Sequence, residues 1–157
     1  MRLYLVQHGD AILEQVDPER PLSAEGRRDV ETVARLLANA GTRAVRVAHS
    51  GKLRAQQTAE LLATALAPGT VPEIMTGLNP NDPVEPVARR VAAWTSETIL
   101  VGHLPFMGKL AARLVAGDER RPVAAFVPGT VVCLEQAEAG YWFIAWMVRP
   151  ELAPLPV

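Results

Sequence analysis

The sequence predicts an α/β protein, a three-layer α/β/α sandwich around a mostly parallel central sheet. Short apolar runs that end near glycine alternate with segments whose apolar residues recur at helical spacing. Two β-rich runs follow near the C-terminus and predict a hairpin. The 157 residues are 49% hydrophobic and 21% charged, which fits one globular domain spanning residues 1–157.

The first strand and helix are predicted from their ends. Residues 2–7 form an apolar run that stops at His8-Gly9, the pattern of a buried strand. A polar loop follows. Ser23 is then a good N-cap, and Gly41 follows the last apolar position, so we predict a helix over residues 24–40.

The second strand and helix repeat this order. Residues 44–48 predict a strand that ends at His49-Ser50-Gly51, and residues 52–67 predict a helix that Pro68 stops. Residues 69–86 are rich in proline, glycine and asparagine. They predict a loop with a short strand at 73–76.

The C-terminal half predicts two more helices, a third strand and the hairpin. The expected elements are a helix at 84–94, a strand at 98–101 ending at Gly102-His103, a helix at 106–115, and hairpin strands at 130–135 and 141–148. Trp142 and Trp146 are expected to pack within the hairpin. Residues 149–157 contain three prolines and predict a loose tail.

Composition excludes several classes of protein. The net charge is −1, so no general electrostatic attraction to nucleic acid or to an acidic membrane surface is expected. No apolar run approaches the roughly 20 residues that span a bilayer. Cys133 is the only cysteine, which excludes an intrachain disulfide, and it is expected in the core. We expect a cytoplasmic protein that binds neither nucleic acid nor membrane.

All three histidines follow predicted strands: His8, His49 and His103. In open α/β sheets, ligands bind at the carboxyl ends of the strands. Two of these histidines are therefore expected to meet in one crevice. A histidine there can be a nucleophile, an acid or base, or a metal ligand. The alternative is a hydrogen-bonded structural histidine.

The junction from Ser50 to Thr58 joins a strand to a helix that carries Lys52 and Arg54 near its start. The N–H groups and dipole of a helix N-terminus favour phosphate, and the planar fork of Arg54 suits phosphate oxygens. The alternative is a solvated helix start. At the third junction, a positively charged His103 could hold another phosphate oxygen.

Nucleotide and metal sites are not expected, and neither is a cofactor. The segment from Gly102 to Lys109 is similar to a phosphate-binding G-x-x-x-x-G-K-[ST] loop, but five residues separate its glycines, and Leu110 stands in the Ser/Thr position. No H-E-x-x-H pattern or carboxylate-rich loop is present.

Taken together, the three junctions resemble the histidine phosphatase superfamily, with its phosphoglycerate mutase-like fold. That family opens with a strand and R-H-G, continues with S-P-x-x-R-A-x-Q-T at a helix start, and has G-H after a later strand. The corresponding segments here are Gln7-His8-Gly9, Ser50 to Thr58, and Gly102-His103. The short chain, together with Arg20-Pro21-Leu22-Ser23, looks most like the SixA-type phosphohistidine phosphatases.

The resemblance implies a metal-independent phosphatase. It implies His8 as the nucleophile that becomes transiently phosphorylated, and Arg54 and His103 as ligands of the phosphoryl oxygens. Phosphoryl transfer needs in-line positioning and charge stabilisation, which a cationic pocket supplies. Gln7, Gly9, Arg20 and Ser50 are placed around the same phosphate as substrate-binding residues.

Gln7 departs from the family pattern, which has arginine there. Glutamine donates hydrogen bonds but carries no charge and no bidentate fork. Loss of one such donor commonly costs on the order of 10²–10³ in kcat, unless Lys52 or Arg20 supplies the missing charge. The departure also keeps open a non-catalytic module that binds phosphate or a phosphoprotein.

No motif supplies a general acid, although Asp10 lies nearby in sequence. Phosphate esters usually need a protonated leaving group, whereas the P–N bond of phosphohistidine is labile. The favoured substrate is therefore phosphohistidine on a protein, and a short chain with an open site suits such a partner. A phosphatase of small phosphate esters is the remaining alternative.

Overall fold

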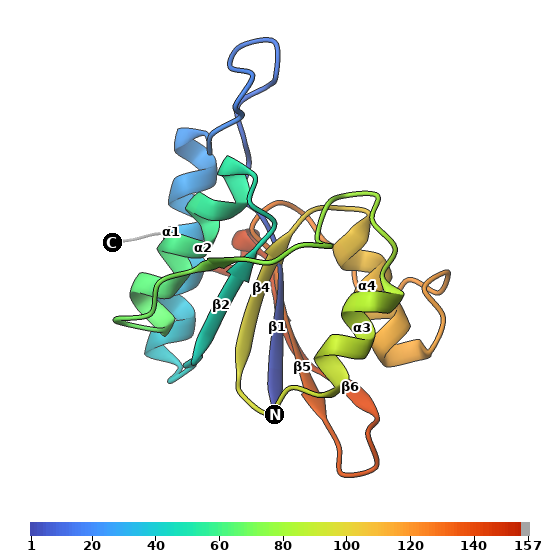
Figure 1. The fold of residues 1–157 in the computed structure, drawn as a ribbon. Helices are drawn as coiled ribbons and strands as arrows, with labels where there is room; N and C mark the ends of the chain where they lie inside the picture. Colours follow the sequence, from blue (N-terminus) through green and yellow to red (C-terminus); the bar gives the residue numbers. More distant parts are fainter. Residues whose placement is uncertain (155–157) are drawn as a thin grey trace.

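The computed structural model describes residues 1–154. Its elements are β1 (Arg2–Gln7), α1 (Ala24–Asn39), β2 (Arg46–His49), α2 (Leu53–Leu66), β3 (Glu73–Ile74), α3 (Glu85–Ala92), β4 (Thr98–Gly102), α4 (Phe106–Ala116), β5 (Val131–Gln136), β6 (Trp142–Val148) and a 3₁₀ helix (Pro150–Leu152). Helices α1 and α2 cover one face of the sheet, and α3 and α4 cover the other (Figure 1). The predicted three-layer α/β/α sandwich is confirmed.

The six-stranded sheet has the order β3-β2-β4-β1-β5-β6. Strands β3, β2, β4 and β1 pair in parallel, whereas β5 pairs antiparallel with both β1 and β6. The mostly parallel sheet and the C-terminal hairpin are thus confirmed. Strand β4 lies between β1 and β2, so the carboxyl end of β1 is beside that of β4, with Gln7 opposite Gly102.

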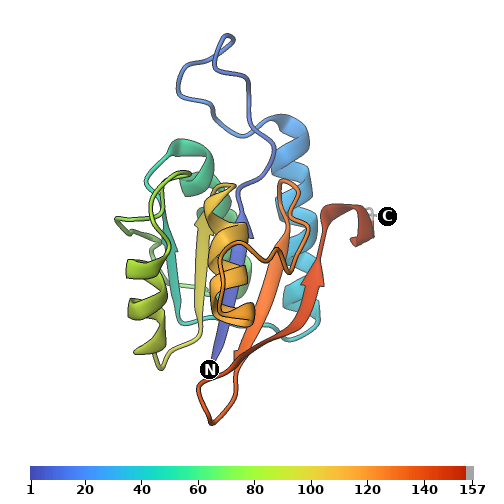
Figure 2. The same ribbon diagram turned by 90° about the vertical axis from the view of Figure 1, so that its right-hand side faces the viewer.

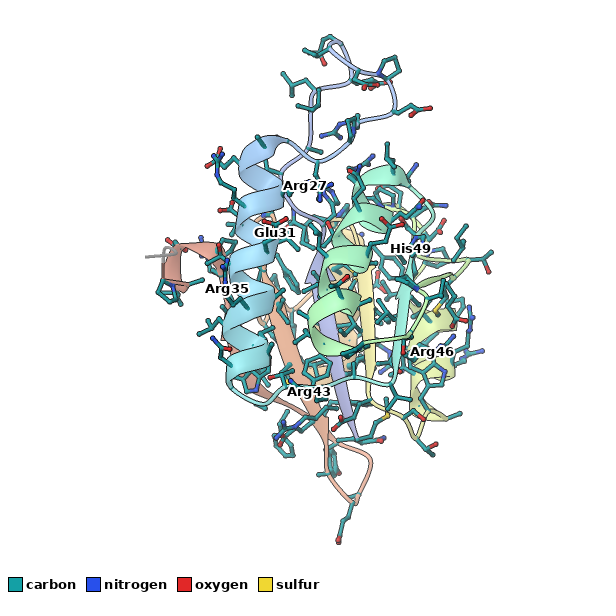
Figure 3. All side chains as sticks on the ribbon, turned by 90° about the vertical axis from the view of Figure 1, so that its left-hand side faces the viewer. Arg27, Glu31, Arg35, Arg43, Arg46 and His49 are labelled. Carbon is teal, nitrogen blue, oxygen red and sulfur yellow. The ribbon has the colours of Figure 1, made fainter. Side chains whose placement is uncertain are left out.

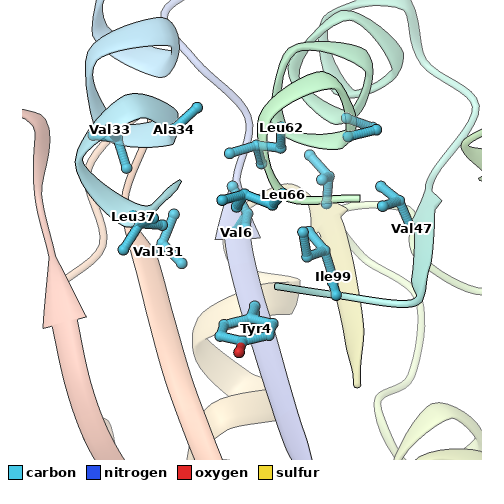
Figure 4. Close-up of a cluster of buried hydrophobic side chains, with 14 of the residues drawn as sticks. Tyr4, Val6, Val33, Ala34, Leu37, Val47, Leu62, Leu66, Ile99 and Val131 are labelled. Atoms are coloured by element: carbon cyan, nitrogen blue, oxygen red, sulfur yellow. The ribbon is translucent and has the colours of Figure 1, made fainter. Parts of the chain in front are cut away.

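Strand β1 is buried because its alternate side chains enter two different cores. Tyr4 and Val6 belong to the cluster under α1 and α2 (Figure 4), whereas Leu3 and Leu5 belong to the cluster under α3 and α4. All four side chains are at most 1% exposed. Full burial of such a side chain contributes about 1.5–3 kcal/mol, so the strand that carries His8 is firmly held.

Helix α1 begins and ends as the sequence predicts. The Ser23 side chain accepts a hydrogen bond from the Gly26 amide at 2.9 Å, which satisfies a free N–H group at the helix start. The buried face carries Val30, Val33, Ala34 and Leu37. On the opposite face, Arg27, Glu31 and Arg35 point to solvent (Figure 3). The helix is therefore held by its apolar stripe.

The packing residues expected in the hairpin are confirmed. Cys133 is fully buried, and Trp142 is 6% exposed in the core under α3 and α4. Trp146 lies over Tyr4 with 5.9 Å between ring centroids. No helix in residues 1–154 is long and apolar enough to cross a membrane.

The predicted loose tail at residues 149–157 is wrong for its first part. A 3₁₀ helix spans Pro150–Leu152 and contacts α1. Ala153 is only 8% exposed and joins the core beside α1. The buried Ala153 thus holds this segment against α1, although the prolines of the segment predict a coil. Residues 155–157 lie outside the described part of the chain.

Candidate active site

Two of the three histidines meet at the carboxyl edge of the sheet. His8 follows β1 and His103 follows β4, and the His8 amide donates to the Gly102 carbonyl at 3.0 Å. Their ring centroids are 4.9 Å apart. His49 ends β2 (Figure 3) but is buried, and its Nδ1 accepts from the Gly51 amide at 3.1 Å. The two histidines that meet, as expected, are therefore His8 and His103, whereas His49 holds the turn that follows β2.

The orientation of the His8 ring is set by its own backbone. Nδ1 lies 2.7 Å from the Gly9 carbonyl, which only accepts hydrogen bonds, so Nδ1 carries the proton. Nε2 then keeps its lone pair, and the Arg54 Nε–H donates to it at 3.3 Å. Burial lowers the pKa of His8 to about 4, with help from the charges of Arg54 and Arg20 and against the Gly9 hydrogen bond. Near neutral pH His8 presents an unprotonated Nε2.

Three cations surround this pair of histidines. Arg54 stands on the first turn of α2, whose N-cap, Lys52, makes no side-chain hydrogen bond to the helix. Arg20 comes from the loop after β1, held in a left-handed conformation with φ of +50° by its Nε–H bond to the Ile12 carbonyl at 3.0 Å. The charges of Arg54, Lys52 and Arg20 all lower the pKa of His103. Such a cluster of positive charges favours an anion.

His103 is held by Ser50. Its Nε2 lies 2.6 Å from Ser50 Oγ, and its ring is 2% exposed. Burial lowers the pKa of His103 to about 3, with further lowering by His8 and the nearby cations. The expected positive charge on His103 is therefore wrong for the site without an anion. A bound phosphoryl group would oppose these effects and favour the charged ring.

The backbone around Gln7 is fixed by a tight turn before β5. The Gly129 amide donates to the carbonyls of Gln7 and His8 at 3.0 and 3.2 Å, and the Gln7 amide donates to the Thr130 carbonyl at 3.2 Å. The Gln7 side chain is 8% exposed, and its Oε1 has no hydrogen-bond partner in the described residues. Gln7, the residue before His8, is therefore buried with an unused acceptor.

Comparisons with known proteins agree with this geometry. The model of the histidine phosphatase superfamily (branch 1) matches residues 3–80. Phosphohistidine phosphatase SixA of Escherichia coli (strain K12) is 30% identical over 155 residues, covering 96% of this chain and 94% of that protein. This chain belongs to the histidine phosphatase superfamily. The match supports a phosphatase of that superfamily, as the three junctions predict.

Two solved structures show the same architecture. The protein histidine phosphatase SixA, complexed with tungstate, superposes with a TM-score of 0.85 at 27% identity, covering 96% of this chain and 97% of that one. The α-ribazole phosphatase from Shigella flexneri superposes with a TM-score of 0.76 at 17% identity, covering 96% and 97%. Because the α-ribazole phosphatase is only 17% identical, its similarity shows the fold alone.

Position 7 lies within the matched residues, but Gln7 stands there in place of the arginine of the R-H-G pattern. Arg20 and Lys52 both lie close enough to influence the titration of His103, and Arg20 also lowers the pKa of His8. With an uncharged Gln7, the positive charges that act on the histidine pair are those of Arg54, Arg20 and Lys52. In residues 1–154, no three His, Cys, Asp or Glu side chains gather where they could hold a metal ion.

Asp10 is not free to face the histidines. Its carboxylate accepts a hydrogen bond from the Ser23 hydroxyl at 2.6 Å, and its carbonyl accepts from the Ser23 amide at 2.9 Å. Its charge still raises the pKa of His8. Asp10 thus lies near the site, with its carboxylate tied to the N-cap of α1.

Sequence reasoning missed two polar residues that hold the site together. Gln57 Oε1 accepts from the Leu22 amide at 2.7 Å, and Thr58 Oγ1 accepts from the Gly9 amide at 3.0 Å. Both residues belong to the segment from Ser50 to Thr58, in which only Ser50, Lys52 and Arg54 are singled out from the sequence. The one available signal was a polar side chain at a buried helical position, because such groups need a partner.

Proposed function

We propose that this chain is a metal-independent phosphatase that hydrolyses phosphohistidine on a protein through a phosphorylated His8. The Nε2 lone pair of His8 attacks phosphorus while the P–N bond to the substrate imidazole breaks. Water then attacks the phosphorus of phospho-His8, releasing inorganic phosphate and restoring the ring. A cytoplasmic location, expected from the sequence, stays part of this proposal.

The proposal rests above all on the protonation state of His8. The Gly9 carbonyl holds the proton on Nδ1, so Nε2 is the nucleophilic atom. With a pKa of about 4, this nitrogen stays unprotonated at neutral pH. The ring therefore needs no separate base to become a nucleophile.

The cations support transfer of a phosphoryl group. Arg54 already contacts the His8 Nε2 at 3.3 Å, the atom that attacks phosphorus, so its guanidinium can bind an equatorial oxygen. The charge of Arg20 also acts on His8, and His103 would become a further donor once a bound phosphoryl group favours its charged form. Fixed donors in a partly buried site stabilise developing charge better than water does.

The phosphohistidine substrate is favoured by its leaving group. No sequence motif supplies an acid for an alkoxide leaving group, and the carboxylate of Asp10 accepts a hydrogen bond from the Ser23 hydroxyl. An imidazole leaving group on a labile P–N bond needs less assistance. The 30% identical relative is itself named a phosphohistidine phosphatase.

Phosphate release from a folded protein phosphorylated on histidine tests the proposal, with metal chelated by EDTA. We expect turnover by the wild type and a loss of at least about 10⁴-fold in His8→Ala. The control is His49→Asn, which alters a histidine at the end of β2 outside the site and should retain activity. A wild type that releases no phosphate, or a fully active His8→Ala, contradicts the proposal.

Gln7 supports a second candidate, a module that binds a phosphoprotein without turnover. Its buried amide lacks the charge that the family arginine brings. Binding of the phosphoprotein with no phosphate release and no acid-labile phosphoenzyme would favour this candidate. Rapid turnover of 4-nitrophenyl phosphate would instead favour an ester phosphatase.

A further inference from the structure

Residues 11–22 form a projecting hairpin, here called the arm. It leaves the sheet directly after Gly9 and Asp10 and stands beyond the three layers (Figure 2). Its base is closed by the Ile12 amide, which donates to the Pro21 carbonyl at 2.8 Å, and by a bridge between Ala11 and Leu22. Gln57 on α2 fixes its returning end through the Leu22 amide. The arm is therefore a defined structure anchored to the body.

The tip of the arm carries two exposed apolar side chains. Leu13 is 59% exposed and Val16 is 75% exposed. The Val16 amide donates to the Leu13 carbonyl at 2.9 Å, closing a turn that brings these two residues close together. Single exposed apolar residues are ordinary on protein surfaces. These two are joined by one turn and lie on a projection that stands beyond the three layers (Figure 2).

The arm is joined electrostatically to the proposed phosphate site. Arg20, near its returning end, lowers the pKa values of His8, Arg54 and His103. Across the histidine pair, the residue that directly follows His103 is Leu104, which is 39% exposed. The cationic site thus has one exposed apolar side chain beside it, Leu104 before α4. Two more, Leu13 and Val16, lie on the arm.

We propose that the arm is a docking element for the protein that carries the phosphohistidine, and this rests on the function proposed above. The partner is a folded domain with an apolar surface beside its phosphorylated histidine. The phosphoryl group would meet the cations, while the apolar surface would cover Leu13 and Val16. Such a division lets charge guide the encounter and apolar contact hold the complex.

The test uses the full chain with Leu13→Ser and Val16→Ser combined. Both side chains are exposed, so thermal unfolding should match the wild type. For a folded histidine-phosphorylated protein we expect KM to rise by about 10-fold or more, the size typical of a lost apolar anchor. Hydrolysis of phosphoramidate, a small P–N substrate, and kcat at saturation should stay unchanged.

The matched control is Val71→Ser. Val71 is 85% exposed but precedes the edge strand β3, so it lies at the amino ends of the parallel strands, whereas His8 and His103 follow the carboxyl ends of β1 and β4. Its KM for the phosphoprotein should equal that of the wild type. An unchanged KM in the double variant overturns the proposal, as does an equal loss of phosphoramidate hydrolysis. A wild-type dimer that the double variant converts to monomer would make the arm a self-association surface and also overturn it.

Failure of the proposed phosphatase activity can be told apart from failure of the docking role of the arm. If the wild type hydrolyses neither the phosphoprotein nor phosphoramidate, the phosphatase proposal itself fails, and docking falls with it. If the wild type hydrolyses both, only the comparison of KM values between the double variant and Val71→Ser decides the role of the arm.

Discussion

The hydroxyl of Thr58 accepts a hydrogen bond from the Gly9 amide at 3.0 Å and donates one to the Arg54 carbonyl at 2.8 Å. One buried side chain thus joins the backbone after the proposed nucleophile to the helical turn that carries Arg54. The distance between His8 and Arg54 therefore depends on Thr58, although Thr58 does not contact the reacting atoms of either side chain.

Thr58→Val should weaken both the fold and turnover. It leaves the buried Gly9 amide without an acceptor, at a cost of about 1–3 kcal/mol in the free energy of unfolding. It also loosens the geometry on which in-line attack depends, so we expect kcat to fall by about 10-fold with little change in KM. Denaturant unfolding and steady-state kinetics measure both effects.

The matched control is Thr64→Val on the same helix. Thr64 is exposed and donates to the Glu60 carbonyl in the same way that Thr58 donates to Arg54, but it accepts nothing from β1. It should change stability by less than about 0.5 kcal/mol. Thr58→Ser, which keeps the hydroxyl, should recover most of kcat. Equal effects of Thr58→Val and Thr64→Val would count against the link.

Gln7→Arg should strengthen the phosphate site. The Gln7 side chain is buried with an unused acceptor, and arginine would bring a charged donor fork to that position. We expect kcat/KM for the phosphoprotein to rise by about 10- to 100-fold, within the range of one oxyanion-type donor. Gln7→Met, similar in length but without charge or donor, is the control. An unchanged kcat/KM in Gln7→Arg would mean that Arg20 and Lys52 already supply this charge.

The two site histidines make the fold sensitive to acid. The folded pKa values are about 4 for His8 and about 3 for His103, against an ordinary value of 6.5. Between pH 6.5 and 4, the unfolded chain therefore binds more protons than the folded one. The free energy of unfolding is highest above pH 6.5 and decreases as the pH falls toward 4. Each histidine lowers it by about 1.4 kcal/mol for each unit of its pKa shift that the pH has crossed.

Urea unfolding at pH 7 and pH 5 measures this loss, in buffers without phosphate because a bound anion would favour protonation. We expect the pH 5 value to be lower by about 2–4 kcal/mol. His103→Asn removes one titrating group and should reduce the difference by about half. The same pH dependence in wild type and His103→Asn would show that other groups cause it.

Two helical glycines should respond in opposite ways to alanine. In α1, a Cβ on Gly26 would lie 2.1 Å from the Asp10 carbonyl oxygen, so the arm's base and the N-cap contact must shift. We expect Gly26→Ala to cost more than about 2 kcal/mol and to reduce turnover. In α4, a Cβ on Gly108 would meet only Leu104 at 3.7 Å.

Gly108→Ala should therefore stabilise the protein by up to about 1 kcal/mol, the difference in helix propensity. Thermal unfolding of the two variants side by side checks the pair. A Gly26→Ala protein with wild-type stability would show that the base of the arm moves freely away from α1.

Local chemistry in the sequence determined the elements and their ends. The apolar run of β1, the Ser23 cap and the stripe of α1 are all set by neighbours within a few residues, and each appears where it is predicted. The positions of His8, His49 and His103 after strands follow from the same local patterns. The positions of Lys52 and Arg54 at the start of α2 also follow from these local patterns.

Only the tertiary structure decided which groups meet. Strand β4 inserts between β1 and β2, so His8 contacts His103 while His49 serves its own turn. Strand pairing is non-local, and spacing along the chain does not encode it. The hydrogen bond from Gly9 to Thr58 and the burial of Ala153 likewise join segments far apart in sequence. The chain itself thus determined a phosphatase-like set of residues, and packing decided the protonation, spacing and surroundings that let them act.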